Sequence, residues 1–292
     1  MKILVLGASG MLGHTLVHQL STIDPDWEIF GTVRSESTYK YFNKKISENF
    51  ISGVNVENVD SLIQVFDRVR PDIVINCVGL VKQLADSEDP LQALPINSIL
   101  PHRLSKLCQL NDSKLIHIST DCVFSGERGG YLETDFSDAK DLYGKSKFLG
   151  EVNYPHTITL RTSIIGHELQ STNGLVDWFL AQEKSCYGFT NAIFSGVPTI
   201  VLADIIGQVV IPNLHKLSGL YQIASEPITK FDLLNLIAQI YKKKIEIIPN
   251  GDLKIDRSLD ATLFFNEAGY IAPGWNNMVK QMHTFRIAKN NV

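Results

Sequence analysis

The chain has 292 residues, 44% hydrophobic and 20% charged, an ordinary balance for a soluble protein of one large domain or two small ones. The net charge of −4 argues against nucleic acid or an anionic membrane as a partner, because either would favour a basic surface. The four cysteines form no CxxC pair, and no stretch approaches the ~18 apolar residues that span a bilayer. We therefore expect a cytoplasmic protein with reduced thiols.

Short apolar runs alternate with helix-like segments through the first half of the chain. The runs typical of buried parallel strands are Ile3–Leu6, Glu28–Val33, Ile73–Asn76, Lys114–Ile118 and Thr157–Leu160, with Ser47–Ser52 as a weaker candidate. Periodic segments predict helices at Met11–Leu20, Asp60–Arg68, Asn97–Leu110 and Tyr143–Val152. This order predicts an α/β Rossmann fold with a doubly wound parallel sheet, and Pro101 should kink or delay the third helix.

After about residue 161 the alternation becomes irregular. We expect helices at Leu175–Gln182, Ala203–Pro212 and Thr229–Lys242, a strand at Gly219–Ala224, and turns at Gly269 and Pro273-Gly274. Thr229 is a candidate N-cap. We therefore predict a dinucleotide-binding Rossmann domain over residues 1–160. Residues 161–292 should form mainly a smaller substrate-binding lobe, with some segments returning to the Rossmann core.

Glycines with GxxGxxG spacing follow the first predicted strand and open the first predicted helix. Glycine allows a positive φ in the tight turn and lets the backbone approach a pyrophosphate, which the free N–H groups of the helix start then bind. This context predicts a dinucleotide site. Its candidate residues are Gly7, Ser9, Gly10, Met11, Leu12 and Gly13.

The end of the second strand indicates which dinucleotide is preferred. An acidic residue there usually bonds the ribose hydroxyl of NAD, whereas an arginine binds the 2′-phosphate of NADP. Here Arg34 stands about 20 residues past the last glycine, with Ser35 beside it, and a guanidinium can fork onto phosphate oxygens. We therefore prefer NADP(H), with NAD(H) left open because Glu36 could swing in.

Tyr143 and Lys147 stand four residues apart, one turn apart on the same face of a helix. Reduction of a carbonyl by hydride needs an acid for the nascent alkoxide, and a neighbouring ammonium should lower the pKa of the phenol and anchor the cofactor ribose. The preceding strand ends in a hydroxyl pair, so we expect Thr120 to bond the substrate oxygen, with Ser119 as the alternative. Tyr41 and Lys45 repeat the spacing but precede the third strand, where we expect no nicotinamide.

His14 and His18 also stand four apart, a spacing that can hold a metal. Leu12, Leu16 and Leu20 occupy the opposite helix face. We therefore predict that both histidines face water and that the chain has no metal site.

Together these segments resemble the dTDP-4-dehydrorhamnose reductases, members of the extended short-chain dehydrogenases. The firm motifs are Gly7–Gly13, Asn76–Gly79, Ser119–Gly126, Tyr143–Lys147 and Leu160–Ser163, and the looser ones are Gly219–Ala224 and Asp256–Leu259. The resemblance covers nearly the whole chain. It departs from the family at Cys122, where a tyrosine is usual, and at Asn55, where an aspartate commonly faces adenine.

The resemblance implies reduction of the 4-keto group of a nucleoside-diphosphate 4-keto-6-deoxyhexose, in the synthesis of deoxysugar or polysaccharide precursors. Tyr143 would donate the proton with help from Lys147. The substrate would meet Thr120, Asp121, Cys122, Ile164 and Arg257. The cofactor site would add Asn55, Val56, Cys77, Val78, Gly79 and Ser119 to the residues already named.

Two other interpretations stay open. One is an epimerase or dehydratase that keeps NAD bound, although the Asp-Glu pair that dehydratases place after the strand-end threonine is here Asp121-Cys122. The other is a non-catalytic, NADP-binding regulatory subunit like the relative that binds methionine adenosyltransferase, against which the intact Tyr143 and Lys147 weigh. The expected partner is a nucleotide sugar, and a homodimer is left open.

Overall fold

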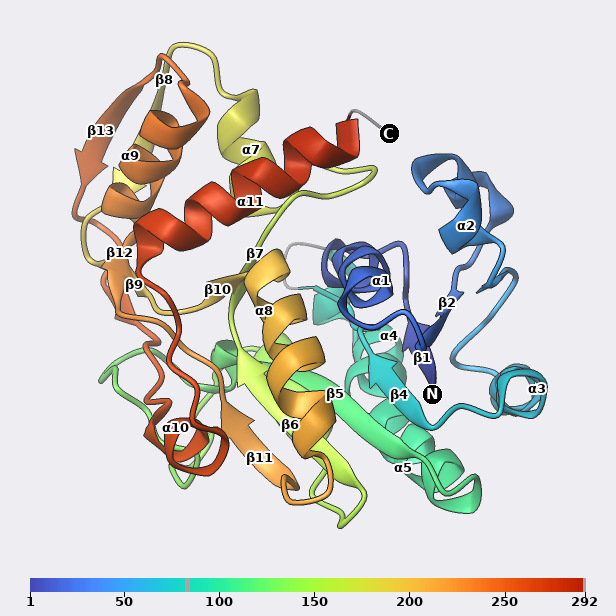
Figure 1. Cartoon of the computed structure of the whole chain (residues 1–292). Coiled ribbons are helices and arrows are strands. Elements are labelled where there is room, and N and C mark those ends of the chain that lie inside the picture. Colours follow the sequence, from blue (N-terminus) through green and yellow to red (C-terminus); the bar gives the residue numbers. More distant parts are fainter. Residues whose placement is uncertain (82–84, 291–292) are drawn as a thin grey trace.

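The computed structural model describes residues 1–81 and 85–290 and is organised around a parallel sheet (Figure 1). Its seven strands lie in the order β11-β6-β5-β4-β1-β2-β3. They are β1 (Lys2–Leu6), β2 (Glu28–Thr32), β3 (Phe50–Ile51), β4 (Ile73–Asn76), β5 (Lys114–Thr120), β6 (Thr157–Thr162) and β11 (Gly219–Gln222). The strand order reverses between β1 and β4, which creates the crevice where ligands bind in doubly wound folds. The predicted fold class is confirmed.

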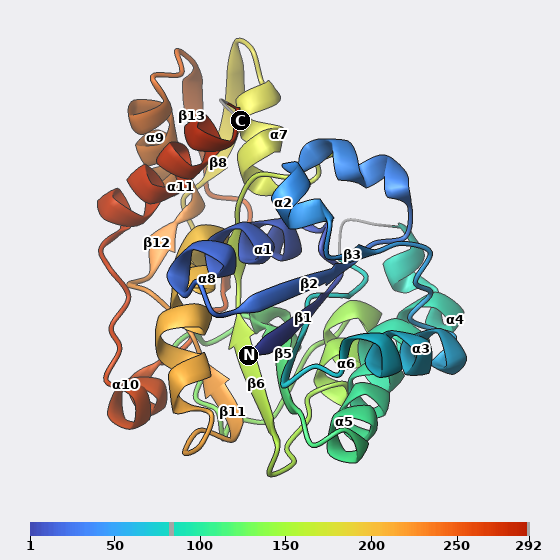
Figure 2. The same ribbon diagram turned by 45° about the vertical axis from the view of Figure 1, so that its right-hand side comes forward.

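Helices cover both faces of this sheet (Figure 2). One face carries α1 (Met11–Ile23) and α8 (Thr199–Ile205), and α11 (Trp275–Asn290) packs on α8 and α9 (Lys230–Tyr241). The other face carries α3 (Val59–Val69), α4 (Pro90–Ala93), α5 (Leu100–Leu110) and α6 (Leu142–Leu149). Side chains alternate along β1, so that Ile3 and Val5 pack in one buried cluster and Leu4 and Leu6 in another. Burial on both faces explains why these strands are continuous apolar runs.

Some local structure differs from the prediction. The helix preceding β5 begins early, at Pro90, and the irregularity expected at Pro101 is a π-helical turn, η3 (Leu94–Ile99), which leaves the proline in the first turn of α5. Ser47–Ser52 contributes only the short β3. It is preceded by η1 (Glu36–Tyr41) and α2 (Lys44–Ser47), and a further short turn, η2, spans Ala85–Glu88.

Short strands of the second half gather above the sheet with α7 (Leu175–Ala181) and α9 (Lys230–Tyr241) (Figure 1). The strand pairs are β8 (Ser185–Phe189) with β13 (Glu246–Asn250), and β7 (Ile164–Ile165) with β10 (Val197–Pro198). A third small sheet places β9 (Ala192–Phe194) between β12 (Ile228–Thr229) and β14 (Ile255–Asp256). The predicted cap is confirmed, since Thr229 Oγ1 accepts from Asp232 N at 3.0 Å.

The segment from Thr199 to Gln222 lies with the central sheet. α8 begins at Thr199, four residues before the predicted helix, with the extended Pro198 at the N-cap position. It continues through η5 (Ile206–Val210) and η6 (Ile211–Asn213). Beyond β14 come α10 (Thr262–Ala268) and α11, separated by the predicted turn in which Gly269 has a φ of +70°. Within the described residues, 1–81 and 85–290, no helix is long and apolar enough to cross a membrane.

The prediction that His14 and His18 face water is wrong. His14 is buried, and its Nδ1 lies 2.9 Å from Gly10 O. His18 is half-buried and stacks on Phe42, with Phe285 of α11 against its edge. The outer side of α1 is covered by segments far away in the sequence, so the helix has two buried faces. The part of the chain that the structure describes holds no group of three His, Cys, Asp or Glu that could bind a metal.

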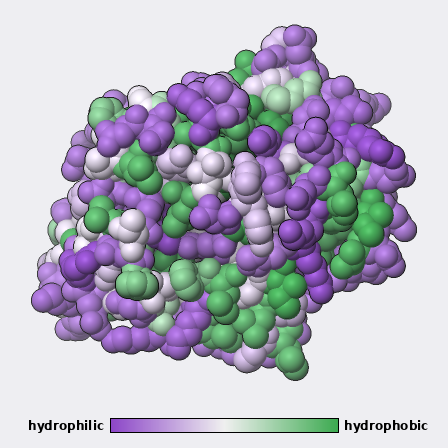
Figure 3. Space-filling model, turned by 90° about the horizontal axis from the view of Figure 1, so that it is seen from below, coloured by the Kyte–Doolittle hydropathy of each residue, from purple (hydrophilic) through white to green (hydrophobic). Residues whose placement is uncertain are grey.

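The surface is mixed in character. Seen from below, hydrophilic residues cover most of the molecule, and hydrophobic residues form smaller groups between them (Figure 3). Phe136 and Leu110 are among the most exposed apolar side chains, at 95% and 86%. Such residues are normal at a protein surface.

Candidate active site

The glycine loop is shaped to bring backbone close to a ligand. Gly7 has a φ of +78°, and Gly10 N donates to Gly7 O at 3.0 Å just before α1 begins. A Cβ on Gly13 would lie 2.1 Å from Gly7 O, so helix and loop pack too closely for any side chain there. Thr32 at the end of β2 holds the loop by accepting from Gly7 N with its Oγ1 and from Ala8 N with its carbonyl.

The first turn of α1 therefore presents unpaired N–H groups and the positive end of the helix dipole beyond the carboxyl ends of β1 and β4. Ser9 and Met11 are half-buried there, whereas the side chain of Leu12 is buried in the core, so only its backbone can face a ligand. This cradle fits the pyrophosphate of a dinucleotide.

The loops after β2 and β3 adjoin each other, since Val54 N donates to Val33 O at 3.4 Å. This places the exposed Arg34 near Asn55, which follows β3. The carboxylate of Glu36 accepts from Ser52 Oγ at 3.0 Å. Arg34 and Glu36 are both exposed at this strand end, and Glu36 is bonded to Ser52.

Other residues predicted here are partly engaged in local turns. Ser35 Oγ caps η1 by accepting from Ser37 N, and Asn55 Oδ1 accepts from Glu57 N at 3.0 Å. Val56 is half-buried and packs beside the core. The Asn55 amide therefore keeps its N–H donors for a ligand, while its oxygen is already used.

The segment after β4 connects the glycine loop to α6. A Cβ on Gly7 would lie 3.0 Å from the side chain of Val78, and one on Gly79 would lie 3.9 Å from Lys147 Nζ. Burial raises the pKa of the Cys77 thiol to about 12, although Lys147 lowers it in part. Cys77, Val78 and Gly79 thus line the path between the two parts of the site.

Tyr143, Lys147 and Thr120 converge, as the sequence motifs predict. Asp141 caps α6 by accepting from Gly144 N at 2.8 Å, which fixes the helix start beside the end of β5. Thr120 lies close enough to Tyr143 for its hydroxyl to lower the pKa of the phenol in part. Lys147 Nζ donates to Ile118 O at 2.8 Å, so the ammonium is anchored to the same strand.

The electrostatics of Tyr143 differ from the expectation. Lys147 was expected to lower the pKa of the phenol, but burial raises it above the usual range, and the Thr120 hydroxyl only partly opposes this. Tyr143 is therefore protonated at neutral pH and able to donate. Burial also lowers the pKa of Lys147 to about 8, with Glu151 and Cys77 acting in the opposite direction.

The two hydroxyls at the end of β5 have different partners. Ser119 Oγ donates to Glu151 Oε1 at 2.7 Å and is buried, whereas Thr120 meets Tyr143 and also donates to Asp121 Oδ1 at 3.1 Å. The structure thus places Thr120, and not Ser119, beside the phenol.

The remaining substrate candidates lie next to this group. Burial raises the pKa of Asp121, opposed by the nearby Arg257 and by a hydrogen bond from Ser163. Arg257 Nε donates to Phe124 O at 2.7 Å, and its Nη1 lies 3.8 Å from Cys122 Sγ. Ile164 in β7 directly follows Ser163 and is half-buried.

Two residues that support the site were not predicted from the sequence. Asn97 joins the segment after β4 to α6, since its Oδ1 accepts from Leu80 N at 2.9 Å and its Nδ2 donates to Ser146 Oγ at 3.1 Å. Glu151 bonds Ser119. Only its position four residues after Lys147 could have suggested that it belongs to the site.

The repeated spacing at Tyr41 and Lys45 does not form a comparable pair. Tyr41 ends η1 and Lys45 lies in α2, so they are not on one helix. Tyr41 instead lines a hollow of about 360 Å³ together with His14, His18 and His167.

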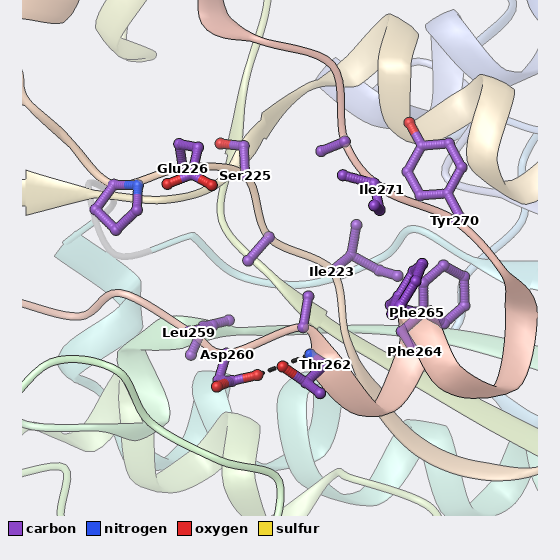
Figure 4. A pocket seen from close by; sticks show the side chains of 14 residues that line it. Ile223, Ser225, Glu226, Leu259, Asp260, Thr262, Phe264, Phe265, Tyr270 and Ile271 are labelled. Carbon is purple, nitrogen blue, oxygen red and sulfur yellow. Dashed lines mark hydrogen bonds between the residues drawn. The ribbon is translucent and has the colours of Figure 1, made fainter.

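A second hollow, of about 320 Å³, lies beside β11 and α10 (Figure 4). Phe264, Phe265 and Tyr270 line one side of it and Ser225 and Glu226 the other. Asp260 accepts from Thr262 N at 2.7 Å on its floor. The residues lining this hollow include none of the predicted site residues.

Comparisons with known proteins identify relatives over most of the chain. The family model described as the RmlD substrate binding domain matches residues 1–258. A dTDP-4-dehydrorhamnose reductase of Aggregatibacter actinomycetemcomitans is 26% identical over 77% of this chain and 74% of its own. A protein of Haloferax volcanii, described as a probable low-salt glycan biosynthesis reductase, is 29% identical over 59% of this chain and 56% of its own. The chain thus spans between about half and three quarters of these relatives.

A solved structure has the same fold. The dTDP-4-dehydrorhamnose reductase of Bacillus anthracis, determined in complex with NADP, superimposes with a TM-score of 0.78 over 97% of this chain and 99% of its own, at 21% sequence identity.

Proposed function

Because the chain belongs to the RmlD substrate binding domain family, we propose that it is an NADPH-dependent reductase of a nucleotide sugar. Its substrate would be a nucleoside-diphosphate 4-keto-6-deoxyhexose, whose keto group becomes a hydroxyl. The observation that carries the proposal is the convergence of Tyr143, Thr120 and Lys147 beside the glycine loop.

The residues of the chain supply the proton and the alignment. NADPH, when bound, supplies the hydride. Tyr143 is protonated and Thr120 lies beside it, so a carbonyl oxygen that binds there meets a proton donor and a second hydroxyl. The Lys147 ammonium is fixed on Ile118 O and is suited to bind the cofactor ribose.

The substrate would extend away from Tyr143 past Asp121 and Arg257. Asp121 accepts from Thr120 Oγ1 at 3.1 Å, and Arg257 brings a positive charge to the same wall. A cation there is suited to a sugar diphosphate. We infer that the segments of residues 161–292 outside α8 and β11 form the lobe that holds the sugar and the nucleotide.

Activity should depend on the charge of Lys147. Its pKa is lowered to about 8, so the side chain is an ammonium below that pH and becomes neutral above it. We expect kcat/KM, which reports the free enzyme, to fall as pH rises through about 8. Lys147→Arg, charged throughout, should lose this alkaline limb. A wild-type profile that is flat to pH 10 would contradict the assignment.

Arg34 should decide between the two cofactors. Arg34→Ala is expected to weaken NADPH binding by roughly tenfold or more, because a charge-assisted bidentate bond to phosphate is lost, and to change NADH binding little. Titration of each cofactor by fluorescence measures both. Arg68→Ala, on the exposed surface of α3, is the matched control. Equal losses of affinity for NADPH and NADH would contradict the role of Arg34 in selecting NADPH.

The whole proposal is tested by NADPH absorbance with a panel of nucleotide 4-keto sugars. We expect oxidation with at least one of them. Tight NADPH binding without oxidation by any would favour the regulatory-subunit interpretation. Tightly held NAD with interconversion of sugar epimers would favour the epimerase.

A further inference from the structure

An ion pair lies buried directly behind the catalytic residues. Arg161 of β6 is 2% exposed and Glu151, which follows α6, is 10% exposed. Two parallel hydrogen bonds join them, from Nε to Oε1 at 2.9 Å and from Nη2 to Oε2 at 2.7 Å. The guanidinium also lies over the ring of Phe124, 4.9 Å from its centroid.

The same carboxylate holds the strand that carries Thr120. Ser119 Oγ donates to Glu151 Oε1 at 2.7 Å, and Ser119 is paired with Arg161 in the register of β5 and β6. Glu151 therefore connects the end of the catalytic helix, the end of β5 and β6 through three hydrogen bonds. Phe124, under the guanidinium, lies four residues beyond Thr120.

Burying two charges costs more free energy than an apolar pair of similar volume, so packing alone does not account for them. A small displacement of this ion pair would move residues of the proposed active site. Lys147 is four residues before Glu151, and Thr120 is the residue after Ser119. A shift of about 1 Å in such groups can lower turnover by roughly 10²-fold.

We propose that Glu151 is a positioning residue of the reaction, which aligns Thr120 through its hydrogen bonds to Ser119 and Arg161. The proposal rests on the reductase function proposed above and deepens it. It assigns a role in the reaction to the residues behind Tyr143.

Loss of the Glu151 charge should move the pKa of Lys147 in a definite direction. The titratable groups that influence Lys147 are Glu151 just beyond the end of its helix, Cys77 after β4 and His117 on β5. Burial lowers the pKa of Lys147, and Glu151 is the larger of the two influences that raise it. Loss of the Glu151 charge should therefore make Lys147 lose its proton at a lower pH.

The test compares Glu151→Gln with Glu151→Asp in the NADPH assay. For the glutamine variant we expect kcat lower by about tenfold or more, with NADPH affinity within about twofold of wild type. Its alkaline limb of kcat/KM should move to lower pH. The aspartate variant keeps the negative charge, so its kcat/KM should fall at the same alkaline pH as that of the wild type. A purely structural role would lower thermal stability without moving the limb.

Folding is controlled by a second variant. Glu151→Gln leaves Arg161 buried without a counter-charge, so Glu151→Gln combined with Arg161→Met removes both charges. It should show the same shift of the alkaline limb. Glu127→Gln, which breaks the exposed ion pair with Lys140, should change neither kcat nor the limb.

The outcomes separate the two proposals. Turnover by the wild type together with an unchanged kcat in both Glu151→Gln variants overturns the role of Glu151 alone. If the wild type binds NADPH but reduces no 4-keto sugar, the reductase function fails and this inference fails with it.

Discussion

Tyr143→Phe should lower kcat by roughly 10²-fold or more while NADPH affinity is largely kept. The ring remains and fills the same space beside Thr120, but the proton that the buried, protonated phenol would give to the nascent alkoxide is gone. The measurement is NADPH oxidation with a saturating 4-keto nucleotide sugar. It should be paired with a cofactor titration, because only the combination separates chemistry from binding.

The matched control is Tyr187→Phe. Tyr187 lies on β8 with 61% of its surface exposed, so removal of its hydroxyl should leave kcat unchanged. Thr120→Val, which keeps the shape but removes the second hydroxyl, should also reduce kcat, by a smaller factor. Near-normal turnover of the Tyr143→Phe enzyme would refute Tyr143 as the proton donor.

Gly13→Ala should weaken NADPH binding by roughly 10²-fold, because a new methyl group that overpacks a tight contact costs about 1–3 kcal/mol. The new Cβ would meet backbone, Gly7 O at 2.1 Å and Gly7 C at 2.8 Å, so the glycine loop and α1 must separate. That movement displaces the N–H groups that would bind the pyrophosphate. Isothermal titration with NADPH gives the affinity directly.

Gly274→Ala is the control for this prediction, because a Cβ there meets nothing within 4 Å. Alanine also favours helices over glycine by about 0.5–1 kcal/mol, so intrinsic propensity should stabilise Gly13→Ala rather than weaken it. Unchanged NADPH affinity in a folded Gly13→Ala protein would show that the loop does not hold the cofactor.

Most of the Rossmann half could be predicted from the sequence, since its elements are local patterns. The strand at Ile73–Asn76 has the predicted bounds, and α1 starts at the predicted Met11. The second half was harder. β8 reads Ser-Cys-Tyr-Gly-Phe, which has no clear period, and it becomes a strand by pairing with β13 about 60 residues later. Long-range pairing of this kind is not visible in a short window.

In the candidate site, too, local patterns could be predicted from the sequence and long-range contacts could not. The glycine turn between a strand and a helix, and Tyr143 and Lys147 one turn apart, are each encoded within a few neighbouring residues, so the sequence alone determined these two local features. Which strand-end hydroxyl lies beside Tyr143 depended on the tertiary structure. Neighbouring residues of a strand point to opposite faces, so the packing that turned Ser119 toward Glu151 and Arg161 left Thr120 for Tyr143. Those partners come from separate elements, and only folding brings them together.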